Sequence, residues 1–139
     1  MSDKVIVFLS CVKSKKDYEC EAQELYSAST LFNKAIKYAK TLNVDKIYIL
    51  SAKYGLVELD DVIAPYDKTL LKMKTTEKKE WASMVKKQLE SKGITFDEKA
   101  IFLCGEVYRK YVAGNFKEVE FPLEGLPIGK QLQFYNNHL

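Results

Sequence analysis

The sequence predicts an α/β fold, a three-layer sandwich in which helices cover both faces of a short, mainly parallel, four-stranded sheet of Rossmann-like type. Two observations predict it. Short apolar runs rich in β-branched residues alternate with segments of helical periodicity, which is typical of parallel sheets. The chain of 139 residues suffices for one core and shows no repeat or linker, so we expect a single domain over residues 1–139.

Four segments are expected to be strands. Residues 5–9, 46–51 and 100–104 are continuous apolar runs, as in strands buried on both faces. Residues 118–121 alternate in polarity and are expected at an edge of the sheet. Numbered along the chain, the strands are expected in the order 2-1-3-4, with right-handed crossovers.

Helices are expected between the strands and after the last one. Apolar residues recur at helical spacing over about 29–42 and 75–92, a short helix follows Gly105, and a final helix covers about 129–137. The stretch 58–74 has no periodicity, and a loop of this length in a small domain is often functional.

Helix boundaries follow from capping residues. Ser29 or Thr30 is expected to cap the first helix, and Thr75 or Thr76 the second. Gly93 is expected to end the second helix, because glycine commonly follows a helix C-terminus.

Composition excludes several classes of protein. No apolar run approaches the roughly 20 residues of a membrane helix, and residues 5–9 are too short for a signal-peptide core, so a cytoplasmic location is expected. The three cysteines form no CxxC or Cys/His cluster, so neither a metal site nor a disulfide framework is expected, and no cofactor is indicated. The only histidine, His138, adjoins the C-terminus, which disfavours a histidine-based nucleophile system.

The positive charge is concentrated in one segment. Residues 68–92 carry eight lysines and three glutamates, whereas the segments before and after each have a net charge of −1. Lys68–Lys92 is therefore a candidate contact for nucleic acid, and the alternative is a solvated helix face. The sequence does not indicate an oligomeric state.

Polar and glycine residues follow each expected strand. Because the carboxyl ends of parallel strands share one edge, we expect these residues to form a single ligand cleft. The candidates are Ser10, Cys11 and Lys13 after the first strand, Ser51, Lys53, Tyr54 and Gly55 after the second, Gly105 and Tyr108 after the third, and Glu124 and Gly129 after the fourth.

Lys53, Tyr54 and Asp67 are the candidate catalytic residues. Lys53 would anchor a phosphate or act as a base, and the alternative is a solvent-facing lysine. Tyr54 and Tyr66 would stack on a base, and the alternative for tyrosine is core packing. Asp67 would orient Lys53 or contact ribose, or it only caps a turn.

The remaining candidates also have two interpretations. Cys11, near Lys13, is either an activated thiolate or a buried, inert cysteine. Gly105 and Gly129 at helix starts either favour an anion or only permit tight turns. Tyr108 either lines the cleft or packs in the core.

Several motifs resemble those of a family of small, largely uncharacterised bacterial and phage domains. The resemblance covers nearly the whole chain. It rests on Ser-Ala-Lys-Tyr-Gly-Leu within 49–57, Pro-Tyr-Asp within 61–67, and the segments 10–15, 25–32 and 122–129.

A fainter similarity links Tyr-Gly-Leu at 54–56 and Asp-x-Ile-x-Pro-Tyr at 61–66 to the family of the peroxide-stress protein YaaA. That similarity implies DNA binding and protection from oxidative damage. Domains of this architecture also occur beside enzymes that modify nucleobases, which implies a nucleotide or nucleobase ligand by analogy.

Three functions follow as hypotheses. The first is an enzyme acting on a nucleotide or nucleobase, by glycosidic-bond or base-modification chemistry. The second is a non-catalytic nucleotide binder, such as a phage-type sponge for a nucleotide signal. The third is a DNA-binding oxidative-stress protein that uses the basic segment.

Overall fold

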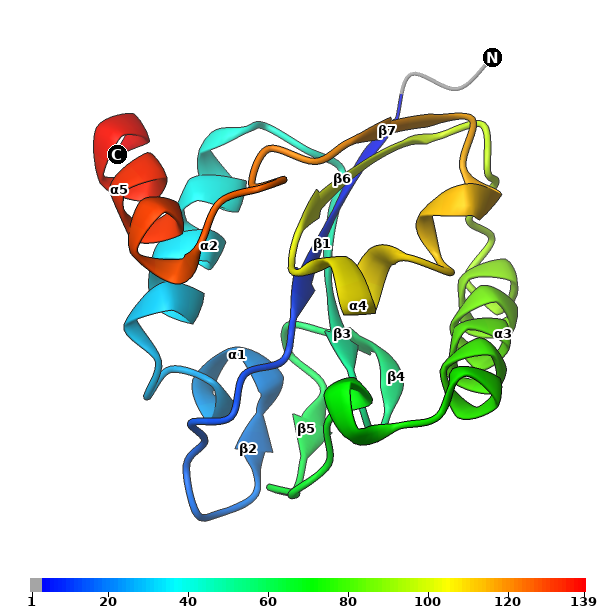
Figure 1. Ribbon diagram of the computed structural model, residues 1–139, viewed down its shortest axis with the longest axis horizontal. Coiled ribbons are helices and arrows are strands. Elements are labelled where there is room, and N and C mark those ends of the chain that lie inside the picture. Colours follow the sequence, from blue (N-terminus) through cyan, green and yellow to red (C-terminus); the bar gives the residue numbers. More distant parts are fainter. Residues whose placement is uncertain (1–3) are drawn as a thin grey trace.

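A five-stranded, mostly parallel sheet forms the centre of the computed structural model, which describes residues 4–139 (Figure 1). Its strand order is β4-β3-β1-β6-β7. The strands are β1 (Val5–Ser10), β3 (Lys46–Ser51), β4 (Gly55–Glu58), β6 (Lys99–Leu103) and β7 (Glu118–Glu120). The four expected strands are present, and their expected order, 2-1-3-4, is confirmed as β3-β1-β6-β7.

Residues 6–9 of the central strand β1 are buried because the strand pairs in parallel on both edges and is covered on both faces. Val7 is opposite Ile47 of β3 on one side and Ile101 of β6 on the other. Ile6, Val7 and Phe8 expose none of their surface. This burial explains why the run from Val5 to Leu9 is continuously apolar rather than alternating.

The expected count of four strands was wrong, because β4 pairs antiparallel with β3 at the edge of the sheet. The chain reverses in a tight turn that ends at Gly55, which has a φ of 76°. Leu56 and Val57 are buried by this pairing. Only a turn was expected here, since the strand is four residues long and lacks a polarity pattern of its own.

A second, two-stranded sheet lies outside the main one. It pairs β2 (Cys20–Glu21) with β5 (Val62–Ile63) in antiparallel fashion. The stretch 58–74, expected to be irregular, thus contains β5 and a 3-10 turn, η1 (Leu70–Lys72). A hydroxyl oxygen of Thr69 accepts the Leu71 N–H at 3.2 Å and starts that turn.

Helices lie on either side of the main sheet (Figure 1). α2 (Thr30–Thr41) and α5 (Ile128–His138) pack together on one side, where Tyr38 meets Phe134 edge-on with ring centroids 5.3 Å apart. α3 (Thr75–Ser91) and α4 (Glu106–Arg109) lie on the other side, where the rings of Trp81 and Tyr108 meet at 6.0 Å. The remaining short elements are α1 (Ala22–Leu25) and η2 (Ala113–Asn115). Between residues 4 and 139, no helix has the length and apolar character needed to span a membrane.

The N-terminal cap of α2 is the one expected from the sequence, whereas that of α3 differs. The Ser29 hydroxyl accepts the Phe32 N–H at 3.2 Å, as expected for a cap of α2. The N-cap of α3 is Lys74, and neither Thr75 nor Thr76. The Glu77 carboxylate accepts the Lys74 N–H at 3.2 Å and takes over the role expected of threonine.

Candidate functional site

A cleft of about 290 Å³ lies at the carboxyl edge of the main sheet. β1, β3, β6 and β7 are parallel, so the segments that follow them emerge at one edge, as expected. The cleft is walled by the loop after β1, by the segment 67–72 that contains η1, and by α4. The residues that bring polar groups to it are Cys11, Lys13, Lys15, Asp67, Lys68, Thr69, Lys72 and Tyr108.

Four lysines and a single carboxylate, Asp67, line this cleft, which we call the lysine cleft. Its lysines are Lys13, Lys15, Lys68 and Lys72. None of the four forms an ion pair with another residue in the described range 4–139. Their charges are therefore left for a ligand, and the concentration of one sign in a concave site favours an anion.

An apolar hollow of about 300 Å³ adjoins the lysine cleft. The two share Val12, Leu71 and Tyr108 as walls. Phe32 of α2 and Ile128 of α5 also line the apolar hollow. Leu71 is 74% exposed and Ile128 is 65% exposed. Two large aliphatic side chains are thus presented to solvent beside a concave apolar surface, as in many small-molecule sites.

Hydroxyl groups form a connected chain next to the cleft. The Ser51 hydroxyl donates to the Tyr66 hydroxyl at 2.8 Å, and the Tyr66 and Tyr26 hydroxyls lie 2.7 Å apart. Tyr26 is fully buried and follows α1, whereas Tyr66 comes from the loop after β5. Three segments far apart in the sequence are held together by these bonds, which fixes the loop that leads to Asp67.

A thiol and a second phenol meet inside the cleft. The Cys11 thiol donates to the Tyr108 hydroxyl at 3.3 Å, which ties the end of β1 to α4. Burial raises the pKa of Tyr26 to about 12. Burial, together with the nearby Cys11, also raises the pKa of Tyr66 and that of Tyr108. These phenols therefore remain protonated at neutral pH and keep their capacity to donate.

Lys15 is the lysine of the cleft whose pKa is shifted by its surroundings. Burial lowers the pKa of Lys15, and the nearby Cys11 and Asp67 partly oppose that shift. Its Nζ lies 4.5 Å from the centroid of the Tyr66 ring and donates to the Lys13 carbonyl at 3.4 Å. The aromatic ring and the carbonyl hold the cation at the boundary between the hydroxyl chain and the cleft.

The expected grouping of Lys53, Tyr54 and Asp67 is not brought together at the cleft. Lys53 is exposed on the β3–β4 turn with its Nζ 5.2 Å from the centroid of the Tyr54 ring. Tyr54 is half-buried, and its hydroxyl donates to the Ala64 carbonyl at 3.3 Å. Neither residue lines the lysine cleft or the apolar hollow, whereas Asp67 lines the cleft. The lysine whose charge Asp67 influences is Lys15.

The structure distributes the other candidates over four places. Cys11, Lys13 and Tyr108 line the lysine cleft, Ser10 and Gly105 line the apolar hollow, Ser51 and Tyr66 belong to the hydroxyl chain, and Gly55, Glu124 and Gly129 lie elsewhere. Glu124 is exposed, 4.0 Å from Arg109. Gly129 lies within α5, and a Cβ there would meet open space.

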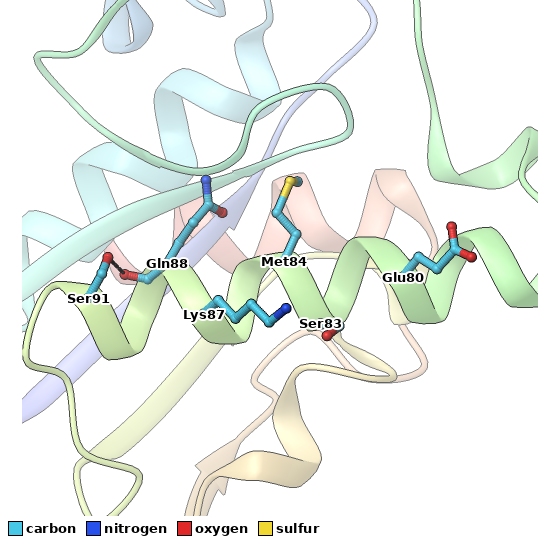
Figure 2. Close-up of a pocket in the computed structure, with 6 residues that line it drawn as sticks. All are labelled: Glu80, Ser83, Met84, Lys87, Gln88 and Ser91. Carbon is cyan, nitrogen blue, oxygen red and sulfur yellow. Dashed lines mark hydrogen bonds between the residues drawn. The ribbon is translucent and has the colours of Figure 1, made fainter.

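Gly55 has a structural explanation. A Cβ at Gly55 would lie 2.3 Å from Gln88 Oε1 and 2.7 Å from Met84 Cε of α3. Gln88 accepts the Leu56 N–H at 2.8 Å and donates to the Tyr54 carbonyl at 3.0 Å, so it fastens α3 to the β3–β4 turn. Figure 2 shows the Met84 and Gln88 side chains projecting from α3 in the same direction.

A shallow groove of about 530 Å³ runs along α3 itself (Figure 2). Its lining residues all come from this one helix, and Lys87 is its only cation. Side chains from different elements do not converge on it, in contrast with the lysine cleft. We therefore place the candidate site at the carboxyl edge of the sheet. Within residues 4–139, no group of three or more His, Cys, Asp or Glu side chains is arranged to hold a metal ion.

Several residues of the site were not among the sequence candidates: Lys15, Thr69, Leu71 and the cleft-lining roles of Lys68 and Lys72. One signal for Lys15 was available. Lys15 lies two residues after Lys13 in the polar loop that follows the first strand, close to Cys11 in the sequence. No sequence signal placed η1 over the end of β1, because that contact joins segments about sixty residues apart.

A comparison with protein families gives one match, over residues 6–137, to a "Family of unknown function (DUF6884)". No curated protein and no solved structure gives a significant match. The matched range includes the loop after β1, the segment 67–72 and α4, and hence the whole wall of the lysine cleft. Because the match spans nearly the entire chain, this protein belongs to the family of unknown function DUF6884.

Proposed function

We propose that this protein binds a nucleotide, with the phosphate in the lysine cleft and the base in the apolar hollow. The observation that carries the proposal is the pairing of these two sites. A cleft with four lysines and one carboxylate shares the wall formed by Val12, Leu71 and Tyr108 with a hollow of similar size that is mainly apolar. A nucleotide has the same division, a charged end and a flat, largely apolar end.

Each part of the ligand would meet suitable chemistry. Lysine ammonium groups bind phosphate as point charges, and their attraction is stronger in a concave, partly dry site than on an open surface. Leu71 and Ile128 offer the base exposed apolar contact area. The sugar would lie between the two, beside Tyr108, which lines both. If the fold is classed as a three-layer, Rossmann-like sandwich, ligands are expected at this edge of the sheet.

Chemistry on the bound nucleotide, such as glycosidic-bond cleavage or base modification, would fall to Asp67. It is the carboxylate of the cleft lining, and Lys15 is the neighbouring group with a lowered pKa. Asp67 would then act as a general base or bind ribose hydroxyls. The alternative is a binder that releases the nucleotide unchanged, for which the lysines and the apolar hollow suffice.

Calorimetry tests the binding proposal. The wild-type protein is titrated with the four nucleoside 5′-monophosphates, with adenosine and with inorganic phosphate. A monophosphate is expected to bind at least about tenfold more tightly than adenosine or phosphate alone, because only it fills both sites. Chromatography of the recovered nucleotide then separates an enzyme, which alters it, from a binder, which returns it intact.

A matched pair of double variants locates the site. K13Q/K68Q removes two charges from the lysine cleft and is expected to weaken nucleotide binding about tenfold or more. K37Q/K40Q removes two exposed charges from α2 and is expected to leave binding unchanged. Equal affinities of both variants for the nucleotide would refute the proposed site.

A further inference from the structure

A second lysine-rich surface lies beside the lysine cleft and surrounds Tyr111. Lys79 Nζ of α3 lies 5.9 Å from the centroid of the Tyr111 ring, and Lys110 Nζ lies 5.5 Å from it. Lys86, seven residues after Lys79 and so on the same face of α3, also borders this surface. We call these four residues the Tyr111 surface.

The Tyr111 surface is hollowed and carries one sign of charge. A shallow depression of about 280 Å³ is lined by Lys79, Lys86, Tyr111, Asn115, Ala82 and Ser83, and no carboxylate is among them. Within residues 4–139, Lys79, Lys86 and Lys110 form no ion pair, whereas Lys92 and Lys46 are both paired with Glu58. The charges of the Tyr111 surface are therefore not neutralised by the protein.

The Tyr111 surface is continuous with the lysine cleft along two elements. Tyr108 of α4 lines the cleft, and Tyr111 follows it by three residues. Lys72 of η1 also lines the cleft, and the chain enters α3 at Thr75. In Figure 1, α4 and the segment after it lie alongside α3. The chain thus leads from the cleft to the half-buried Tyr111 ring through α4, and to Lys79 through the start of α3.

We propose that the Tyr111 surface binds the strand of a single-stranded nucleic acid that continues from the nucleotide held in the lysine cleft. This inference rests on the proposed nucleotide site and names its ligand as one residue of a polymer. Lys79, Lys86 and Lys110 contact backbone phosphates, and the Tyr111 ring stacks on an unpaired base. Interleaved cations and aromatic rings are the usual means of holding single strands, whose bases are free to stack. In a duplex the bases stack on one another, so no free base face is available to the Tyr111 ring.

Fluorescence anisotropy with labelled single-stranded DNA and RNA of about 12 nucleotides, across a salt series, tests the inference. The wild-type protein is expected to bind the oligonucleotide more tightly than a mononucleotide, with an affinity that falls steeply as salt increases. K79Q/K86Q is expected to reduce the magnitude of the salt slope by about 1.4, that is about 0.7 for each lost phosphate contact. Y111L is expected to weaken binding about tenfold while changing the salt slope little, because it removes stacking and no charge.

Controls separate this inference from the nucleotide site. K79Q/K86Q and Y111L are expected to bind mononucleotides like the wild type, and K37Q/K40Q is expected to bind the oligonucleotide like the wild type. If mononucleotides bind but the oligonucleotide gains nothing over them, the strand-binding surface is refuted and the nucleotide site survives. If K37Q/K40Q loses as much affinity for the oligonucleotide as K79Q/K86Q does, the inference is also overturned. The same holds if poly-glutamate or duplex DNA binds more tightly than the single strand. A preference between the DNA and RNA strands identifies the sugar that is recognised.

Discussion

Lys15 is the residue that gives the lysine cleft a distinctive pH dependence. Burial lowers its pKa, so its ammonium group loses its proton at a lower pH than an exposed lysine does. The other three cleft lysines are exposed. The positive charge that Lys15 contributes to the cleft is therefore expected to be lost as the solution becomes alkaline.

We expect phosphate-bearing ligands to bind less tightly as the pH rises into the alkaline range, because Lys15 then loses its proton. Affinity is expected to fall with rising pH because only the protonated, positively charged form of Lys15 attracts an anion. K15Q is expected to bind more weakly at pH 7 and to lose this alkaline decline. The measurement is the dissociation constant between pH 7 and 10. A decline of equal size in K15Q would contradict the role of Lys15.

The three cysteines are expected to differ in reactivity because the fold places them differently. Burial raises the pKa of Cys104 to about 12, so at pH 8 only about one molecule in ten thousand carries its thiolate. Burial and Glu24 also raise the pKa of Cys20, but Cys20 remains partly exposed. Mass spectrometry after timed alkylation at pH 8 should show Cys20 modified well before Cys104.

Unfolded protein provides the control for that experiment, since all three thiols should then react alike. Native protein in which Cys104 reacts as fast as Cys20 would show that the end of β6 opens readily. That result would also weaken the apolar hollow as a preformed site, because Cys104 lines it.

At the scale of elements, the contact between α3 and the β3–β4 turn depends on Gly55. Gly55 has a φ of 76° and also has Gln88 and Met84 within 3 Å of the position a Cβ would occupy. Gly93 has a φ of 77° but open space around that position. The two glycines therefore share the same backbone strain on substitution and differ in the steric clash.

We expect Gly93→Ala to lower the free energy of unfolding by about 1 kcal/mol, the cost of a left-handed backbone for a residue with a Cβ. Gly55→Ala is expected to lower it by about 2–4 kcal/mol, because displacement of Gln88 is added to that cost. Urea denaturation of the two variants measures the difference. Equal effects would mean that Gln88 moves aside at no cost and does not fasten α3.

Sequence patterns predicted the elements whose signal is local. The apolar runs at 5–9, 46–51 and 100–104 indicated strands that are buried on both faces of the sheet. Each of these signals is contained within a single run of the sequence. β4 and β5 were missed because they are only four and two residues long. Their pairing depends on partners that no local pattern reveals, and the same is true of the Lys74 cap, where Glu77 serves in place of a hydroxyl.

At the scale of the whole molecule, the parallel sheet explains why distant residues meet. The rule that loops after parallel strands share an edge correctly gathered Cys11, Lys13 and Tyr108. It could not show which side chains face inward. Lys53 follows β3 at the same edge, but the reversal into β4 leaves it exposed on the turn. The segment 67–72, which has no strand signal, supplies five of the ten lining residues of the lysine cleft.

The walls of the proposed binding site are held in place by β1 and by the hydroxyl chain. β1, whose residues 6–9 are buried, leads into the loop that carries Lys13 and Lys15. The hydroxyl chain of Ser51, Tyr66 and Tyr26 holds the loop that leads to Asp67. A ligand in the lysine cleft would therefore contact segments that are already positioned, which favours affinity because little ordering is needed.

Amide chemical shifts in the presence of a nucleoside monophosphate test the lysine cleft most directly. With assigned ¹H–¹⁵N spectra, the largest shifts are expected in residues 11–15, 67–72 and 104–108, which form the walls of the lysine cleft and the apolar hollow. Shifts confined to the exposed face of α3 around 80–91, or to the β3–β4 turn at 52–55, would contradict the assignment of the site to this edge of the sheet.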